Sequence, residues 1–140
     1  MSDSLQRINA AIIDGRCRTT RYIQRQLTTL HAALVQESSN LQLAIVKDTG
    51  CSQAEAWFEV HMTVQAVKDQ YEAIDFKESL QQEYSIAQGK QNLDRRLPFG
   101  CAYIVPCKHS RLYSIIQPAV AAIAAGNCVV IEVCTKLLSG

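Results

Sequence analysis

The spacing of apolar side chains divides the chain into a helical amino-terminal part and a carboxyl-terminal part with two short strands. In the first part, apolar positions recur three or four residues apart, which is the period of one face of an α-helix. This pattern predicts four helices. Their apolar stripes are Leu5, Ile8 and Ile12; Ile23, Leu27, Leu30 and Leu34; Leu41 to Val46; and Ala56, Val60, Val64, Val67, Tyr71 and Ile74.

Glycines and short polar residues mark the ends of these helices. Gly15 should end the first helix and Gly50 the third, because glycine readily takes the left-handed conformation of a helix C-cap. Ser52 can cap the start of the fourth helix, and Glu55 three residues later completes the pattern of a capping box. We therefore expect residues 1–76 to be helical.

Residues 77–96 depart from the helical period. Tyr84, Ile86 and Leu93 favour extended structure, and the polar run 88–92, which contains a glycine, is typical of a turn. The pattern predicts an additional strand or a hairpin arm in this segment.

Residues 97–140 predict a βαβ unit. Cys101 to Val105 and Cys128 to Ile131 are short apolar runs, as in strands that are buried on both faces. Between them, Leu112 to Ala125 is an apolar helix rich in alanine, and Gly126 stands where a left-handed cap would close it. Two strands joined by such a helix lie parallel, with a right-handed crossover.

The predicted fold class is therefore α/β, with an amino-terminal helical layer packed on a partial Rossmann-like βαβ unit and an extra strand or hairpin. No repeat, low-complexity run or Pro/Gly-rich linker divides the sequence, so we expect a single domain over residues 1–140. A chain of 140 residues can bury a modest core.

The charge and composition of the chain limit the kinds of partner that it is expected to bind. The net charge of +1 gives no electrostatic case for nucleic acid or for an anionic membrane surface, and no apolar run reaches the length of a membrane span. The start of the chain lacks a signal-peptide pattern, and its six cysteines show no metal or disulfide spacing. We expect a cytoplasmic protein with reduced thiols, no metal and no membrane or nucleic-acid partner.

Polar side chains follow each predicted strand, where open α/β sheets place their binding crevice. Because neighbouring parallel strands lie about 4.8 Å apart, the two groups can meet. The candidate catalytic residues are Cys107, Lys108, His109 and Glu132. The candidate substrate-binding residues are Ser110, Arg111, Tyr113, Cys134 and Lys136. The alternative interpretation is that strand ends and loops are ordinarily polar without any function.

In the catalytic hypothesis, each side chain has a role that suits its chemistry. His109 acts as acid and base, Glu132 orients the imidazole or balances its charge, and Lys108 or Cys107 polarises or attacks a carbonyl group.

Two stretches of this sequence resemble the aldehyde dehydrogenase superfamily, nearest its fatty-aldehyde branch. PFGCAYIV followed by QPAVAAIAAGNCVVIEV is similar to the family's strand, P/T-W-N loop and A-I-A-A-G-N helix end. Upstream, RQLTTLHAALVQESSNLQLAIVKDTGCSQAEAWFEV resembles its amino-terminal helices. The resemblance covers nearly the whole chain, but it corresponds to only the opening third of a family member.

The resemblance also exposes departures at the family's functional positions. Lys108 aligns with the loop tryptophan, and His109 aligns with the asparagine that donates to the oxyanion. Glu132 aligns with the lysine that binds the adenosine ribose, and residues 133–135 replace the proline, serine and glutamate that follow it. The chain stops before the pyrophosphate-binding turn, the general base and the nucleophilic cysteine. The resemblance therefore implies no NAD or NADP cofactor and no dehydrogenase activity.

Two functional hypotheses remain open at this stage. One is a homodimeric remnant of the fold that binds a small organic molecule and serves as a cofactor-independent isomerase, cyclase or lyase. The alternative is a noncatalytic interaction or regulatory protein. The homodimer is expected because strands that extend the sheet in the resembled family are missing, which leaves apolar edges for a second copy to cover.

Overall fold

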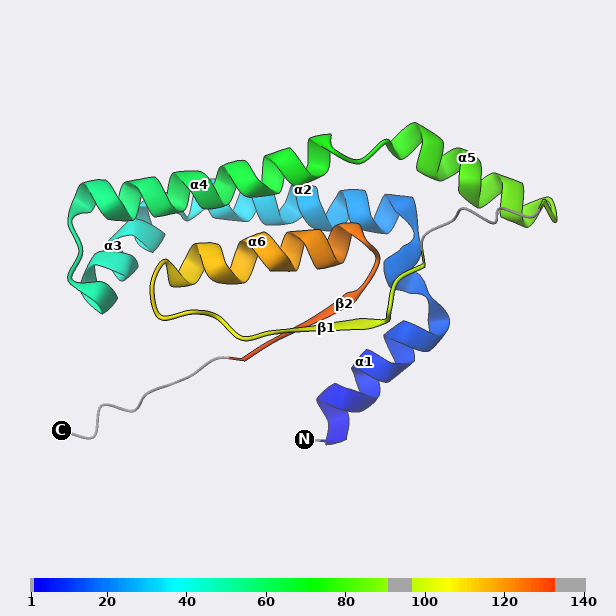
Figure 1. The fold of residues 1–140 in the computed structure, drawn as a ribbon, viewed down its shortest axis with the longest axis horizontal. Coiled ribbons are helices and arrows are strands. Elements are labelled where there is room, and N and C mark those ends of the chain that lie inside the picture. The colour runs from blue at the N-terminus through cyan, green and yellow to red at the C-terminus, as the bar shows by residue number, and fades with distance from the viewer. Residues whose placement is uncertain (1, 91–96, 133–140) are drawn as a thin grey trace.

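The computed structural model describes residues 2–90 and 97–132, and its ribbon is drawn in Figure 1. Over these residues the chain forms six α-helices, one short 3-10 helix and two β-strands. In chain order they are α1 (Ser2–Asp14), η1 (Arg16–Arg18), α2 (Thr20–Gln36), α3 (Ser38–Thr49), α4 (Gln53–Glu72), α5 (Phe76–Ala87), β1 (Cys101–Ile104), α6 (Arg111–Ala124) and β2 (Cys128–Ile131).

The predicted βαβ unit is present. β1 and β2 pair in parallel, in a register that runs from Cys101 opposite Cys128 to Ile104 opposite Ile131. α6 makes the connection between them, and Pro118 is accommodated inside this helix. The structure is therefore mostly helical, with a small parallel sheet of two strands in its described part.

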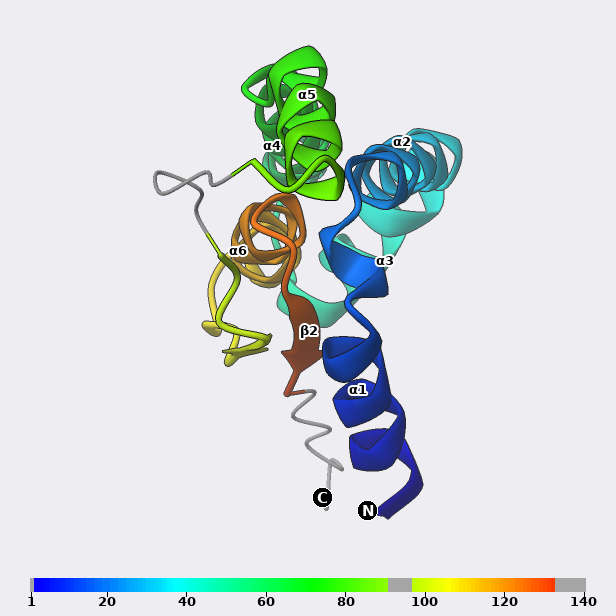
Figure 2. The ribbon, with the colours of Figure 1, turned by 90° about the vertical axis from the view of Figure 1, so that its right-hand side faces the viewer.

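Helix α6 occupies the middle of the molecule. It packs against α4 and α2 on one side and against both strands on the other. Figure 1 and the turned view of Figure 2 both show α6 between the helical layer and the sheet, with α1 lying beside β2. Val120, at the centre of α6, is only 1% exposed, and small alanines around it allow the neighbouring elements to approach closely.

The core lies between α2, α4 and α6, where the predicted apolar stripes meet. Its buried members are Ile23, Leu27, Leu34, Val67 and Val120. The stripes of the second and fourth predicted helices are thus confirmed as buried faces. The buried hydroxyl of Thr63 is also satisfied, because its Oγ1 donates a hydrogen bond to the carbonyl oxygen of Glu59 at 2.7 Å.

The predicted helix ends are confirmed as well. Ser52 and Glu55 form both bonds of the capping box at the start of α4. Gly50 adopts a left-handed conformation after α3, and Gly15 does so after α1. These signals succeed because a cap involves residues that are close together in the sequence.

Gly126 is also confirmed as a left-handed cap, with a φ angle of 81°. A Cβ added at Gly126 would lie 3.4 Å from Cα of Arg18 and 3.5 Å from the carbonyl oxygen of Cys17, which are ordinary van der Waals distances. The turn between α6 and β2 therefore packs against the backbone of η1, and the positive φ angle of Gly126, not a lack of space, is what favours glycine here.

The strand or hairpin predicted for residues 77–96 is wrong over the described residues, which form helix α5 up to Ala87. Asp75 caps the helix by accepting a hydrogen bond from the backbone N–H of Glu78 at 2.9 Å. Tyr84 and Ile86 are exposed on this helix, so their alternation reflects solvent exposure and not a sheet face. The turn begins as predicted at residues 88–89, whereas residues 91–96, with Leu93, lie outside the described residues.

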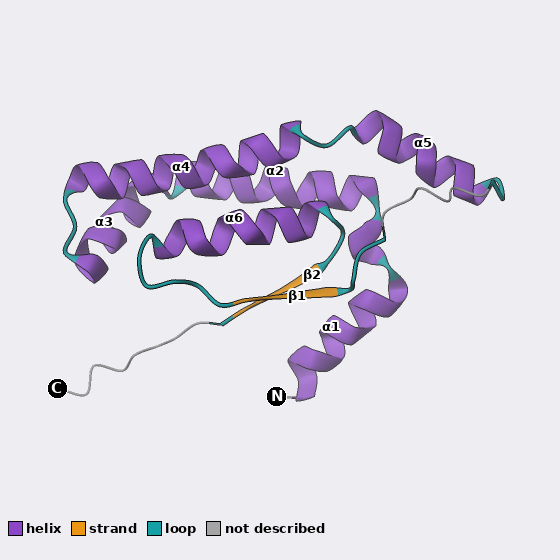
Figure 3. Cartoon of the chain, in the orientation of Figure 1, coloured by secondary structure: helices purple, strands orange, loops and turns teal. Residues whose placement is uncertain are grey.

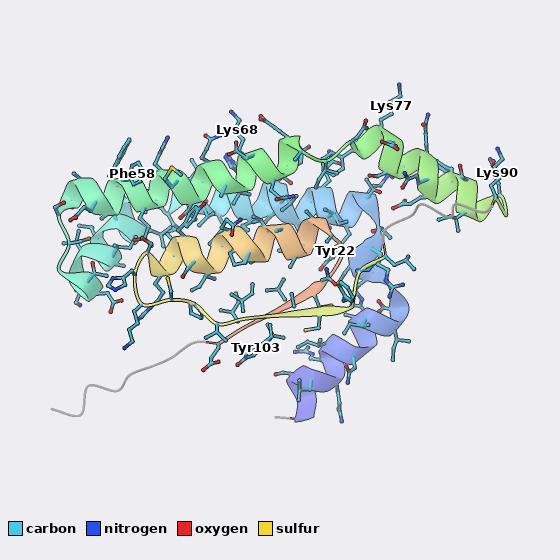
Figure 4. All side chains as sticks on the ribbon, in the orientation of Figure 1. Tyr22, Phe58, Lys68, Lys77, Lys90 and Tyr103 are labelled. Carbon is cyan, nitrogen blue, oxygen red and sulfur yellow. The ribbon has the colours of Figure 1, made fainter. Side chains whose placement is uncertain are left out.

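The prediction that both strands are buried on both faces is also wrong. Ile104 is buried, but Tyr103 is 62% exposed, and Val105 after the strand is exposed as well. Figure 4 shows Tyr103 on the side of the strands that faces away from α6. An apolar run indicates strand structure but does not reveal which side of the sheet is covered.

In the portion of the chain that is described, no helix combines enough length with enough apolar character to cross a bilayer.

We predict that Leu27→Ala lowers the free energy of unfolding by about 3 kcal/mol, because it opens a cavity around a fully buried side chain. Leu43→Ala is the matched control, since Leu43 is 63% exposed, and its effect should stay within about 0.5 kcal/mol. Urea unfolding followed by circular dichroism measures both variants. Equal losses in the two variants would contradict the assignment of the core.

Candidate functional site

A groove of about 930 Å³ lies where the loop after β1 and the first turn of α6 meet the ends of α3 and α4. In Figure 3, the loop after β1 and the connection between α3 and α4 lie at the same end of the molecule. The groove is lined by Lys108, His109, Ser110, Arg111 and Tyr113 from the loop and α6, and by Asp48, Thr49, Cys51, Ala54, Glu55, Phe58, Glu59 and Met62 from the other side.

Glu59 of α4 holds the start of α6 in place. The side chain of Ser110, the N-cap residue of α6, makes no capping hydrogen bond. Oε1 of Glu59 instead accepts from the backbone N–H groups of Leu112 at 2.9 Å and Tyr113 at 3.4 Å. A helix begins with unpaired N–H groups and a partial positive charge, so this carboxylate satisfies two donors and complements the helix dipole.

The backbone is strained at the same place. Ser110 has a φ angle of 47° and a ψ angle of 52°, and within the described chain it is the one residue other than glycine with positive φ. This left-handed conformation costs energy for a residue with a Cβ and persists only when neighbouring contacts enforce it. The Glu59 contacts enforce it on one side, and an ion pair between Arg111 and Asp48 at 3.4 Å ties the helix start to α3.

The acidic side chains of the groove are already engaged. Asp48 pairs with Arg111, and Glu59 accepts from the start of α6. Oε2 of Glu55 accepts from the backbone N–H and the hydroxyl of Ser52, both at 2.8 Å, and these bonds lower the pKa of the Glu55 carboxyl. The groove therefore contains no acidic side chain without a partner over the part of the chain that is described.

The basic side chains of the loop, unlike the acidic side chains of the groove, have no hydrogen bond or ion pair among the described residues. Among the hydrogen bonds and ion pairs of the described residues, none involves the side chain of Lys108 or His109. Both residues are exposed at the groove, across from the apolar side chains of Phe58 and Met62 on α4. As far as the described residues go, the groove thus offers an ammonium group outside any ion pair and an imidazole, both beside an apolar wall.

The other candidate residues lie elsewhere. Cys107 does not line the groove, and its Sγ donates to the carbonyl oxygen of His109 at 2.6 Å, which tightens the loop. Glu132 is also outside the lining, and its Oε2 accepts a hydrogen bond from Oη of Tyr103 at 2.7 Å. Cys134 and Lys136 lie outside the described residues. The groove therefore joins the loop after β1 to α3 and α4, and not to the end of β2.

Sequence reasoning missed the wall formed by α3 and α4. Glu59 reaches a backbone 53 residues further along the chain, and no local pattern marks such a contact. Phe58 and Met62 did carry a signal, because they are large apolar residues one turn apart and lie beside the buried stripe of α4.

Metal binding has no support in residues 2–90 and 97–132, where no group of three or more His, Cys, Asp or Glu side chains is arranged to hold an ion.

Comparison with known proteins identifies relatives over most of the chain. The aldehyde dehydrogenase family matches residues 15–136. The chain is 29% identical to aldehyde dehydrogenase family 3 member A2 of Macaca fascicularis and 27% identical to aldehyde dehydrogenase family 3 member B1 of Bos taurus, in each case over 94% of its length. These matches span 28% and 29% of the two relatives. No solved structure matches the chain.

We predict that Glu59→Gln destabilises the start of α6 by about 1 kcal/mol, because the charge that complements the helix dipole is lost. Amide hydrogen exchange should become faster at Leu112 and Tyr113. Glu72→Gln, at an exposed position of the same helix, is the control and should leave both rates unchanged. If the two amides exchange at the same rate in the Glu59 variant as in the parent, the capping role is refuted.

Proposed function

We propose that this chain, which belongs to the aldehyde dehydrogenase family, binds a small organic anion in the groove and does so without a nicotinamide cofactor. The observation that carries the proposal is the charge imbalance of the groove. Its acidic groups have partners within the protein, whereas Lys108 and His109 are available to a ligand. A carboxylate group suits the ammonium of Lys108, and a short apolar portion of the ligand suits Phe58 and Met62.

The chemistry available at such a site is proton transfer. An imidazole can remove a proton beside a carbonyl group and return it at another atom. We therefore propose His109 as the acid and base in a cofactor-independent isomerisation, cyclisation or elimination of a carboxylate that also bears a carbonyl. Lys108 is proposed to bind the carboxylate, and Ser110 and Tyr113 to contact the remainder of the ligand.

The absence of nicotinamide chemistry is supported by residues of this chain. The βαβ unit is proposed to be a partial Rossmann-like unit, in which β2 would carry the ribose-binding lysine of the resembled family. Glu132 stands at that position, where a carboxylate repels the phosphates of a dinucleotide. The relatives named as dehydrogenases are three to four times longer than the matched region, so their activity is not assigned to these 140 residues.

The exposed sheet face supports the proposed homodimer, and it also suits the second candidate function, a noncatalytic interaction protein. Tyr103 and Val105 are largely exposed there, together with Leu97 and Phe99 just before β1. Exposed apolar residues in such numbers are typical of an interface. We propose that a second copy of the chain covers this face through a two-fold contact.

We predict that the chain is a dimer at micromolar concentration and that Tyr103→Glu shifts it toward monomer, because a charge would be buried in the contact. Tyr84→Glu, at an equally exposed site on α5, is the control and should remain a dimer. Light scattering after size exclusion measures the mass. A monomeric parent protein would refute the proposed contact.

We predict that phenylacetate binds the groove at least tenfold more tightly than the neutral phenylacetamide, because only the acid can pair with Lys108. Lys108→Ala should weaken phenylacetate binding about tenfold, and Lys77→Ala, on α5 (Figure 4), should leave it unchanged. Chemical-shift titration of the labelled protein gives both affinities.

Equal affinities for the two probes, or no effect of Lys108→Ala, would overturn the proposed binding site. The cofactor proposal has a separate test, since calorimetric titration should detect no binding of NAD or NADP. Micromolar affinity for either dinucleotide would refute that part alone.

A further inference from the structure

We propose that Cys17 and Cys128 form a reversible disulfide when the protein meets a peroxide, and that this bond fastens the amino-terminal segment to the sheet. The two Sγ atoms lie 3.4 Å apart, although the residues are 111 positions apart in the sequence. Cys17 is in η1, and Cys128 is the first residue of β2. Both are partly buried and free in the described structure.

The positions of both thiols are fixed independently of any bond between them. Cys128 is held by the strand register, and the backbone N–H of Cys128 donates to the carbonyl oxygen of Gly100 at 2.9 Å. η1 is held against the turn at Gly126, as its close approach to Cys17 and Arg18 shows. A disulfide needs the sulfurs to close to about 2.05 Å, a movement that rotation of the two side chains and a small shift of the short η1 segment can supply.

An oxidant can reach the pair. Both cysteines line a cleft of about 360 Å³ between α1, the start of α2 and β2. Arg7 lines the same cleft, as do Arg16, whose guanidinium pairs with Asp14, and Tyr22, which is labelled in Figure 4. Guanidinium groups favour a nearby thiolate and stabilise the hydroxide that leaves a peroxide. The cleft therefore combines two adjacent thiols with access and positive charge, which ordinary buried cysteines lack.

The two sulfurs have different roles in the reaction. Burial, together with the hydrogen bond to Cys17, raises the pKa of the Cys128 thiol to about 11, so Cys128 keeps its proton at neutral pH. Cys17 is then the sulfur that attacks first. The Cys17 thiol gives up its proton as its sulfur bonds to one oxygen of hydrogen peroxide, the O–O bond breaks, and the hydroxide that leaves takes up that proton to form the first water.

The second step closes the bond. The Cys128 sulfur attacks the sulfenic acid on Cys17, its proton goes to the departing oxygen, and water is released. Two thiols lose two electrons and one hydrogen peroxide gains them, so the products are one disulfide and two molecules of water. A dithiol such as dithiothreitol reverses the change by thiol–disulfide exchange.

Cys101 is the competing partner, because it lies opposite Cys128 in the strand register. It is exposed, and its Sγ points to the carbonyl oxygen of Ala102 at 3.9 Å. The direct sulfur contact of Cys128 is with Cys17, which favours the bond across the cleft over a bond across the sheet.

The experiment treats the purified, fully reduced chain with one equivalent of hydrogen peroxide. The intact mass should fall by about 2 Da, and peptide mapping without reduction should join the peptides that contain Cys17 and Cys128. Because the bond closes a loop of more than a hundred residues, the thermal midpoint should rise by about 10 °C and return after dithiothreitol.

The variants separate the two possible bonds. Cys17→Ser should abolish both the mass change and the rise in midpoint, whereas Cys101→Ser should retain them. A bond mapped between Cys101 and Cys128, oxidation of Cys17 without a bond, or a bond that leaves the midpoint unchanged would each overturn the proposal. The peptide map is made on the parent protein, so it decides the question even if a variant does not fold.

Discussion

The packing of α6 between two partners is the constraint on which the rest of this structure depends. A parallel sheet of two short strands cannot be stable by itself, because it has too little apolar surface to bury. α6 supplies that surface on one side and joins the helical core through Val120 on the other. The loop before α6 can hold a defined shape only because the helix is fixed at both faces. The groove therefore depends on the packing of α6 between the helical layer and the strands.

Local patterns predicted much of this fold, and tertiary contacts account for what they missed. The buried stripes of α2 and α4 and the capping box at Ser52 follow from residues that are close together in the sequence. The sequence pattern predicts a strand or hairpin where α5 lies, because two exposed apolar residues, Tyr84 and Ile86, alternate there. The position of the strand ends predicts the residues on the loop side of the groove. It does not predict Glu59, because the N–H groups that Glu59 accepts from lie on another helix. Only the folded chain brings those groups together.

The two ends of the βαβ unit carry different chemistry. At the carboxyl end of β1, an ammonium and an imidazole face an apolar wall. At the amino end of β2, two thiols face each other across a cleft. The strands separate the two sites, so a change of charge at one has little effect on the other at physiological ionic strength. A change of charge at one end of the βαβ unit can therefore leave the other end unaffected.

Two helices of this chain take their caps from other helices, and this has a consequence for the order of folding during synthesis. Glu59 leaves the ribosome before the residues of α6 that it caps, so its carboxylate is ready when that helix emerges. The backbone N–H and hydroxyl of Thr20, at the start of α2, both donate to Glu83, which is made 63 residues later. Until then the first turn of α2 has no cap from α5 and should fray. The first turn of α2 thus completes its hydrogen bonds only after more than half of the chain has been translated.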